Sequence, residues 1–178
     1  MTRIYSLLLS ALLLFTIGGL SAYAADCPAG TKKETVTKKG GSRIVSCIDG
    51  AGLKQGPETH WLANGKKMSE GEWRDGKEHG AWILYWRNEK KREKAQYRKG
   101  RKHGPETLWH QNGKIAGEVK YFDGKKHGKS VEFWGGGKKR SDGSYYDGKK
   151  IGTWYEWDWQ GKLIKMETCT AGYCRTTK

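Results

Sequence analysis

A 24-residue period runs through most of this chain. Glycine recurs at this interval, and the octets WRDGKEHG, YRKGRKHG and YFDGKKHG, which end at Gly80, Gly104 and Gly128, are near copies of one another. A fixed period of this length is typical of tandem structural repeats, in which each unit contacts its neighbours. The period divides the chain into five repeats, 56–79, 80–103, 104–127, 128–151 and the divergent 152–174.

Two turn signals occur in a typical repeat. They are Asn-Gly pairs at 64–65 and 112–113, and Asp-Gly pairs at 75–76, 123–124 and 147–148. Both dipeptides suit two-residue hairpin loops that need positive φ. The second repeat has Asn88-Glu89 and Lys99-Gly100 instead, so its turns are expected to be looser. The pattern predicts an all-β fold, a single-layer antiparallel meander of about ten strands.

Aromatic residues fall in two columns of the aligned repeats. The first column is Trp61, Tyr85, Trp109, Phe133 and Trp157, and the second is Trp73, Tyr97, Tyr121 and Tyr145. Each ring of the second column follows a small residue by two positions, which places both on the same face of a strand. Since Leu, Ile and Val are few, we expect these columns to form the stacked spine of a thin sheet.

The segments outside the repeats indicate export. Residues 1–24 combine Arg3, an apolar run and Ala22-Tyr23-Ala24, which is the pattern of a cleaved signal peptide. Residues 25–55 then form an N-terminal cap and 175–178 a short tail, and no later run is long and apolar enough to span a bilayer. The expected location is periplasmic or extracellular.

Four cysteines lie in two pairs at the two ends of the array. Export favours disulfides, and local bridges Cys27–Cys47 and Cys169–Cys174 avoid spanning the whole array. Zinc is the competing interpretation, but there is no CxxC spacing and the pairs are too far apart to share an ion. No metal or cofactor is expected.

The repeat motif carries a resemblance to a known family. GEWRDGKEHG, from Gly71 to Gly80, resembles the MORN repeat, and the unit with a central NGK is similar to the bacterial YwqK-type antitoxin repeats. The CPAG segment that begins at Cys27 resembles exported bacterial members. The resemblance implies a single-layer antiparallel sheet and contact with proteins or membranes, and it implies no enzymatic activity.

The residues that could carry chemistry have structural explanations. His79, His103 and His127 share one column, and two strands per repeat place successive members roughly 10 Å apart, too far for one metal ion. Ile151 in the same column favours packing beside the glycine that opens each repeat. The aspartates suit turns and the glutamates suit pairing with lysines across strands, so a catalytic carboxylate pair is not expected.

The distribution of charge is the feature that points most strongly to function. The chain has 34 Lys and Arg against 19 Asp and Glu, and the second repeat alone holds nine basic and two acidic residues. One explanation is that basic loops along both edges keep a flat sheet soluble. The other is attraction to an anionic partner: phospholipid head groups, lipopolysaccharide or an acidic protein. Nucleic acid suits the composition but not an exported protein.

We therefore predict a binding patch on the second repeat. It consists of Trp86, Arg87, Lys90, Lys91, Arg92 and Arg98. Since neighbouring side chains on a strand alternate faces, Trp86 is expected on the face opposite to Tyr85, near Arg87 and Lys94. The predicted function is a non-enzymatic binding or scaffold module of the cell envelope. An antitoxin-like or immunity-like inhibitor of a partner protein is the alternative, and a hydrolase with an unrecognised site is a third.

Overall fold

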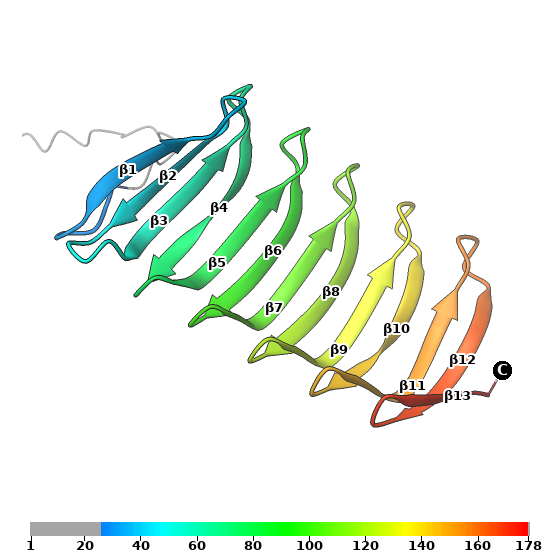
Figure 1. The fold of residues 1–178 in the computed structure, drawn as a ribbon. Coiled ribbons are helices and arrows are strands. Elements are labelled where there is room, and N and C mark those ends of the chain that lie inside the picture. Colours follow the sequence, from blue (N-terminus) through cyan, green and yellow to red (C-terminus); the bar gives the residue numbers. More distant parts are fainter. Residues whose placement is uncertain (1–25, 178) are drawn as a thin grey trace, which may run out of the picture.

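A computed structural model describes residues 26–177 as one antiparallel sheet of thirteen strands, without helix, so the predicted signal peptide lies outside the described residues. The strand order in the sheet follows the chain, and every connection is therefore a hairpin (Figure 1). The predicted all-β, single-layer antiparallel meander is confirmed. Among residues 26–177, no helical segment has the length and hydropathy of a membrane span.

The five repeats supply ten of the strands, as expected. They are β3 (Lys54–Trp61), β4 (Lys67–Arg74), β5 (Lys77–Tyr85), β6 (Lys91–Arg98), β7 (Arg101–Trp109), β8 (Ile115–Phe122), β9 (Lys125–Phe133), β10 (Lys139–Tyr146), β11 (Lys149–Trp157) and β12 (Leu163–Thr170). The cap adds β1 (Lys32–Thr37) and β2 (Arg43–Ile48), and the chain ends in β13 (Tyr173–Thr176). The count exceeds the prediction because the cap and the C-terminal segment also pair with the array.

From β3 onward, the hairpin connections form two different edges of the sheet (Figure 1). Two-residue turns form the turn edge, at 75–76, 99–100, 123–124, 147–148 and 171–172, and both residues of each turn have positive φ. Five-residue loops form the loop edge, at 62–66, 86–90, 110–114, 134–138 and 158–162. The second repeat closes both of its connections in the same way as the others.

The prediction of two-residue turns at Asn-Gly is wrong. At the first of these loops, Gly65 alone has positive φ, at 79°, and its N–H donates to Leu62 O at 3.0 Å. The Asn64 side chain accepts a hydrogen bond from Lys66 N at 3.1 Å. This is a wider loop with one left-handed residue at its end, a geometry that also favours Asn followed by Gly.

One face of the sheet, here called the packed face, carries most of the buried side chains. A series of cross-strand neighbours runs along it: Ser46, Glu58, Gly71, Trp82, Ala95, Glu106, Val119, Ser130, Gly143, Trp154 and Glu167. Trp82 and Trp154 lie directly against Gly71 and Gly143, where a Cβ atom would come within 2.2 Å of each ring. The small residues therefore make room for these tryptophans, which the two predicted columns did not include.

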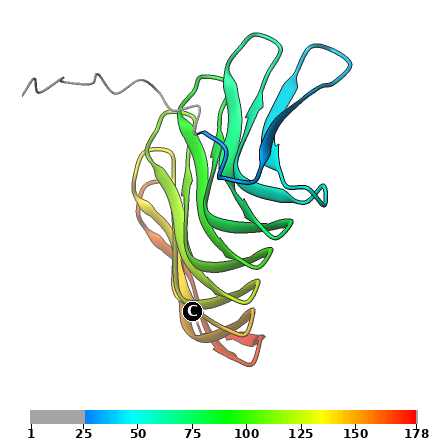
Figure 2. The same cartoon turned by 90° about the vertical axis from the view of Figure 1, so that its left-hand side faces the viewer.

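The two aromatic columns lie on opposite faces, so the prediction of a single stacked spine is wrong. Trp73 contacts Trp82 on the packed face, with 5.6 Å between the ring centroids. Trp61 is on the other face, here called the open face, because it follows Thr59 by two positions, and Thr59 pairs with Glu70 rather than with a residue of the packed series. The ordinary alternation of side chains accounts for this placement, and the register shift between His60 and Trp61 adds Met68 on β4 without changing the face of Trp61. The recurring shifts are consistent with the bent strands seen in Figure 2.

Both predicted disulfides are confirmed. Cys27 bridges to Cys47 on β2, and Cys169 on β12 bridges to Cys174 on β13. The first ties the segment before β1 to β2 within the cap, and Pro28 of that segment packs against Gly56 at the start of the first repeat. Two disulfides indicate folding in an oxidising compartment.

Candidate binding surface

Side chains on the loop edge link each loop to the next. Trp86 Nε1 donates to Trp109 O at 3.0 Å, Asn88 Nδ2 donates to Gln111 O at 2.9 Å, and Lys90 Nζ donates to Asn112 O at 2.9 Å. The following loop repeats the arrangement with His110, Asn112 and Lys114. The recurring Asn and Lys of the loops therefore have a structural role, and Lys90 is engaged within the protein.

A groove of about 560 Å³ opens beside the loop of the second repeat. It is lined by Leu62, Met68, Tyr85, Trp86, Arg87, Asn88, Arg92 and Gln111. The Trp86 ring is half-buried, and the Arg92 guanidinium lies 5.6 Å from its centroid. Since the indole N–H is held by Trp109 O, the ring forms a fixed wall of the groove.

The arginines of this groove lack the counter-ion that the fourth repeat has. There, Arg140 lies 5.0 Å from the centroid of the Trp134 ring and 3.9 Å from the Glu132 carboxylate. In the second repeat Leu84 occupies the position equivalent to Glu132. No ion pair joins Arg87 or Arg92 to a carboxylate within residues 26–177. These two charges are therefore free to meet an external anion.

The structure brings together part of the predicted patch. Trp86, Arg87 and Arg92 converge on the groove, and Lys90 binds the neighbouring loop. Lys91 pairs with Tyr85, whose side chain is on the open face. Arg98 lies at the turn edge, seven residues along β6 and roughly 20 Å from Lys91.

Two expectations about this surface need correction. Arg92 rather than Lys94 flanks the Trp86 ring, because Lys94 pairs with Ile83 on the open face. Leu62 and Gln111 belong to the neighbouring repeats and were missed. The 24-residue period could have found them, since Leu62 is one period before Trp86 and Gln111 is one period after Arg87.

Buried carboxylates on the packed face are neutralised by cations. Glu58 pairs with Lys54 and shares a hydrogen bond with the His60 ring, and Lys102 bridges Glu106 and Glu93, the latter at 2.7 Å. Burial lowers the pKa of the Lys102 ammonium, but the two glutamates outweigh this and hold its pKa well above the usual range. The pairs of Glu58 lie within β3, and Lys102 joins Glu106 of its own strand, β7, to Glu93 of β6, so these groups are arranged as structural ion pairs.

Two of the recurring histidines, His103 and His127, pack against aromatic rings of adjacent strands. The sequence predicts packing beside the glycine that opens each repeat. On the turn-edge side, ring centroids lie 5.0 Å apart for His103 and Phe122, 6.0 Å for Phe122 and His127, and 5.1 Å for His127 and Tyr146. Phe122 on β8 thus contacts His103 on β7 and His127 on β9.

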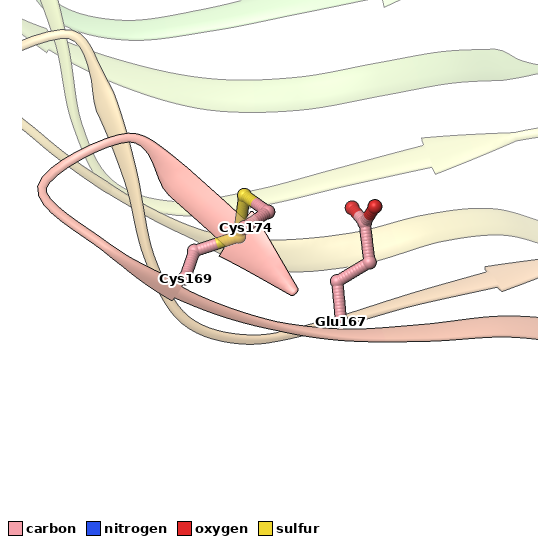
Figure 3. Close-up of side chains that lie close together, drawn as sticks. All are labelled: Glu167, Cys169 and Cys174. Carbon is pink, nitrogen blue, oxygen red and sulfur yellow. A yellow bond between two sulfur atoms is a disulfide. The ribbon is translucent and has the colours of Figure 1, made fainter. Parts of the chain in front are cut away.

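One cluster of metal-ligand residue types occurs within residues 26–177: Glu167, Cys169 and Cys174. Figure 3 shows the two sulfur atoms joined as a disulfide, with the Glu167 carboxylate on β12 beside them. A metal binds the thiolate and not the disulfide, so this group is not a ligand set in the oxidised protein.

Comparisons with known proteins add little. No family model matches the sequence, and no curated protein is similar to it. One solved structure, the S. aureus TarM G117R mutant in complex with Fondaparinux, alpha-GlcNAc-glycerol and UDP, aligns over 69% of this chain and 21% of its own, with 13% identity and a TM-score of 0.34. A similarity this weak carries no argument about function.

Proposed function

We propose that the protein is a non-enzymatic binding or scaffold module of the bacterial cell envelope, which docks on anionic lipid head groups through the loop edge of its second repeat. The observation that carries this proposal is the pair of unneutralised arginines, Arg87 and Arg92, beside the fixed Trp86 ring. Near an anionic membrane each basic residue contributes about 1 kcal/mol of attraction, and an aromatic ring suits the interface.

Two further features support an envelope location. Residues 1–24 have the pattern of a signal peptide, and the two disulfides suit an oxidising compartment. The resemblance of the repeats to the MORN family agrees with a role in contact rather than in catalysis, and we propose that relationship on the motif and on the hairpin array.

The test is sedimentation with vesicles that contain phosphatidylglycerol, over a range of salt concentrations. The double variant Arg87→Glu, Arg92→Glu is expected to bind about ten-fold more weakly or worse, because two attractive charges become repulsive. The matched control is Lys120→Glu, Lys129→Glu, which makes the same change in net charge at exposed strand positions. Lys90 is left intact because it links two loops.

Equal losses in the two double variants would contradict the proposal, and so would binding that does not depend on salt. Either result would mean that the basic residues serve to keep the sheet soluble.

An inhibitor of a partner protein is the second candidate. Leu62 and Met68 form an apolar side of the same groove, and the Met68 side chain is 44% exposed. An apolar wall suits protein side chains better than head groups. A stoichiometric complex recovered from envelope extract, together with failure to bind vesicles, would favour this candidate.

A further inference from the structure

On the turn edge, one turn has a basic residue at a position where three others have an aspartate. At the first residue of the two-residue turns the first four repeats have Asp75, Lys99, Asp123 and Asp147. All four are left-handed, with φ of 52° at Lys99. Asp is among the residues that tolerate this conformation best, whereas Lys has no such preference. The left-handed backbone at Lys99 is therefore strained, and such strain is often found at functional sites.

The aspartates of this edge are bound by groups of the preceding repeat or, for Asp75, of the cap. Asp147 pairs with Lys125 at 2.7 Å, and Asp75 accepts a hydrogen bond from Gln55 at 2.9 Å. For the turn of the second repeat, the residue equivalent to Lys125 is Lys77 of the first repeat, and it lines the same pocket as Lys99. A Cβ atom on Gly100 would lie 3.7 Å from the Cβ of Lys77, so Lys77 sits directly beside this turn. Two cations therefore meet where the fourth repeat has an ion pair.

Two arginines join this pair. Arg98 and Arg101 are direct cross-strand partners that flank the turn. Together with Lys77, Lys99 and Asp123 they line an open pocket of about 550 Å³. Asp123 is the one carboxylate among the lining residues, and it is already shared by His103 at 3.2 Å and Arg98 at 3.4 Å. These bonds hold the pKa of Asp123 below its usual range, so its carboxylate is ionised. The carboxylate is already engaged by His103 and Arg98.

We propose that Lys77, Arg98, Lys99 and Arg101 form a binding site for a phosphate group. Four cations with one engaged carboxylate leave a net positive charge that a multiply charged anion can neutralise. A phosphate has several oxygens that accept the paired N–H groups of arginine, and two arginines opposite each other on a hairpin suit this geometry. The site lies at the opposite edge from the loop-edge groove and does not depend on its function.

The decisive variant is Lys99→Asp, which introduces the residue of the first, third and fourth repeats. It places a carboxylate beside Lys77 and favours the left-handed turn, so the variant is expected to be at least as stable as the native protein. Its affinity for inorganic pyrophosphate in isothermal titration is expected to fall by about ten-fold or more. Lys129→Asp makes the same charge change on an exposed part of β9 and is the control. Arg101→Gln, which leaves the turn unaltered, should also weaken binding.

Two measurements distinguish the two possible sources of the phosphate group, a soluble compound and a lipid. Binding of pyrophosphate indicates a soluble phosphorylated compound, and binding only to vesicles with phosphatidic acid indicates a lipid head group. In the first case Lys99→Asp must lose pyrophosphate binding while Arg87→Glu, Arg92→Glu retains it. In the second case Lys99→Asp must lose binding to the phosphatidic acid vesicles while Lys129→Asp retains it. The proposal is overturned if the native protein binds neither probe, if Lys99→Asp binds as the native protein does, or if Lys129→Asp loses as much.

Discussion

Positive φ at residues other than glycine marks the positions of local strain in this array. Within residues 26–177 these are Asp75, Glu89, Lys99, Asp123, Asp147 and Ala171. The three aspartates tolerate the conformation, but Glu89 stands where the other loops have Gly65, Gly113, Gly137 and Gly161. The second repeat thus has unfavourable residues at both of its connections, and both adjoin the basic clusters.

Glu89→Gly is expected to stabilise the protein by about 1 kcal/mol, because a side chain in the left-handed region costs roughly 1–2 kcal/mol. The variant loses the pair between Glu89 and Lys66 at 3.3 Å, but both side chains are exposed and such a pair contributes little. Urea unfolding measures the change, with Glu118→Gly in β8 as a destabilised control. A loss of stability in Glu89→Gly would show that the ion pair outweighs the backbone strain.

Gly143→Ala is expected to destabilise the sheet by about 1–3 kcal/mol, the usual cost of overpacking. The new Cβ atom would come within 2.2 Å of the Trp154 ring, which is 4% exposed and cannot move aside freely. Gly136→Ala is the control, since a Cβ atom there meets nothing within 4 Å. Similar melting temperatures for the two variants would mean that Trp154 does not pack on Gly143 as described.

At the scale of elements, the pairing of β4 with β5 includes a charged hydrogen bond on the open face. The Tyr85 hydroxyl donates to Glu70, and Lys67 Nζ donates to the same carboxylate at 2.6 Å. Burial raises the pKa of Glu70, but these two bonds outweigh it and hold the pKa below the ordinary value of 4.5. The stabilisation is therefore present when Glu70 is ionised and is lost as the pH falls through the lowered pKa.

Tyr85→Phe should reveal this dependence. The variant is expected to be about 1 kcal/mol less stable than the native protein at neutral pH. The difference should shrink once the pH falls below the ordinary carboxyl value of 4.5 and Glu70 becomes protonated. Urea unfolding of both proteins at about pH 7 and about pH 3 measures it. Tyr155→Phe is the control and should show no such change, whereas a constant difference for Tyr85→Phe would assign the effect to packing.

At the scale of the molecule, the sheet is a linear array in which each strand pairs only with its sequence neighbours. Stability should then be close to a sum over repeats and their interfaces. Each loop binds the next, and each turn glycine donates to a carbonyl 22 residues earlier, as Gly124 N does to Lys102 O at 2.8 Å. These contacts recur with the period, so a whole repeat can be removed without breaking their pattern.

Deletion of residues 104–127 is accordingly expected to leave a folded protein. Its melting temperature should be lower because one set of interfaces is lost, and its long dimension should shorten by about 10 Å, the width of two strands. Circular dichroism and small-angle X-ray scattering measure the two changes. Deletion of 12 residues from the same repeat is the control and should unfold the array, since it puts loops and turns out of phase. An unfolded 24-residue deletion would contradict the additive description.

The sequence by itself was sufficient to predict the 24-residue period, the hairpin meander and both disulfides. These features depend on contacts between residues that are close in the chain, so composition and spacing reveal them. The role of Gly71 and Gly143 was also partly visible, because a small residue recurred two positions from a ring.

The tertiary structure alone decided which side chains share a face and which charges remain unpaired. In the register that pairs Glu58 with Gly71, the alternation of side chains puts Trp61 and Trp73 on opposite faces, and the spacing of the aromatics along the chain does not by itself give that cross-strand register. The pairing of Lys125 with Asp147 joins residues 22 positions apart on the turn edge, and the contact of Arg140 with Glu132 joins neighbouring strands. Lys99 and Arg92 stand out as unneutralised only once the equivalent pairs are seen in space, because charge compensation depends on distances across strands and not on counts along the chain.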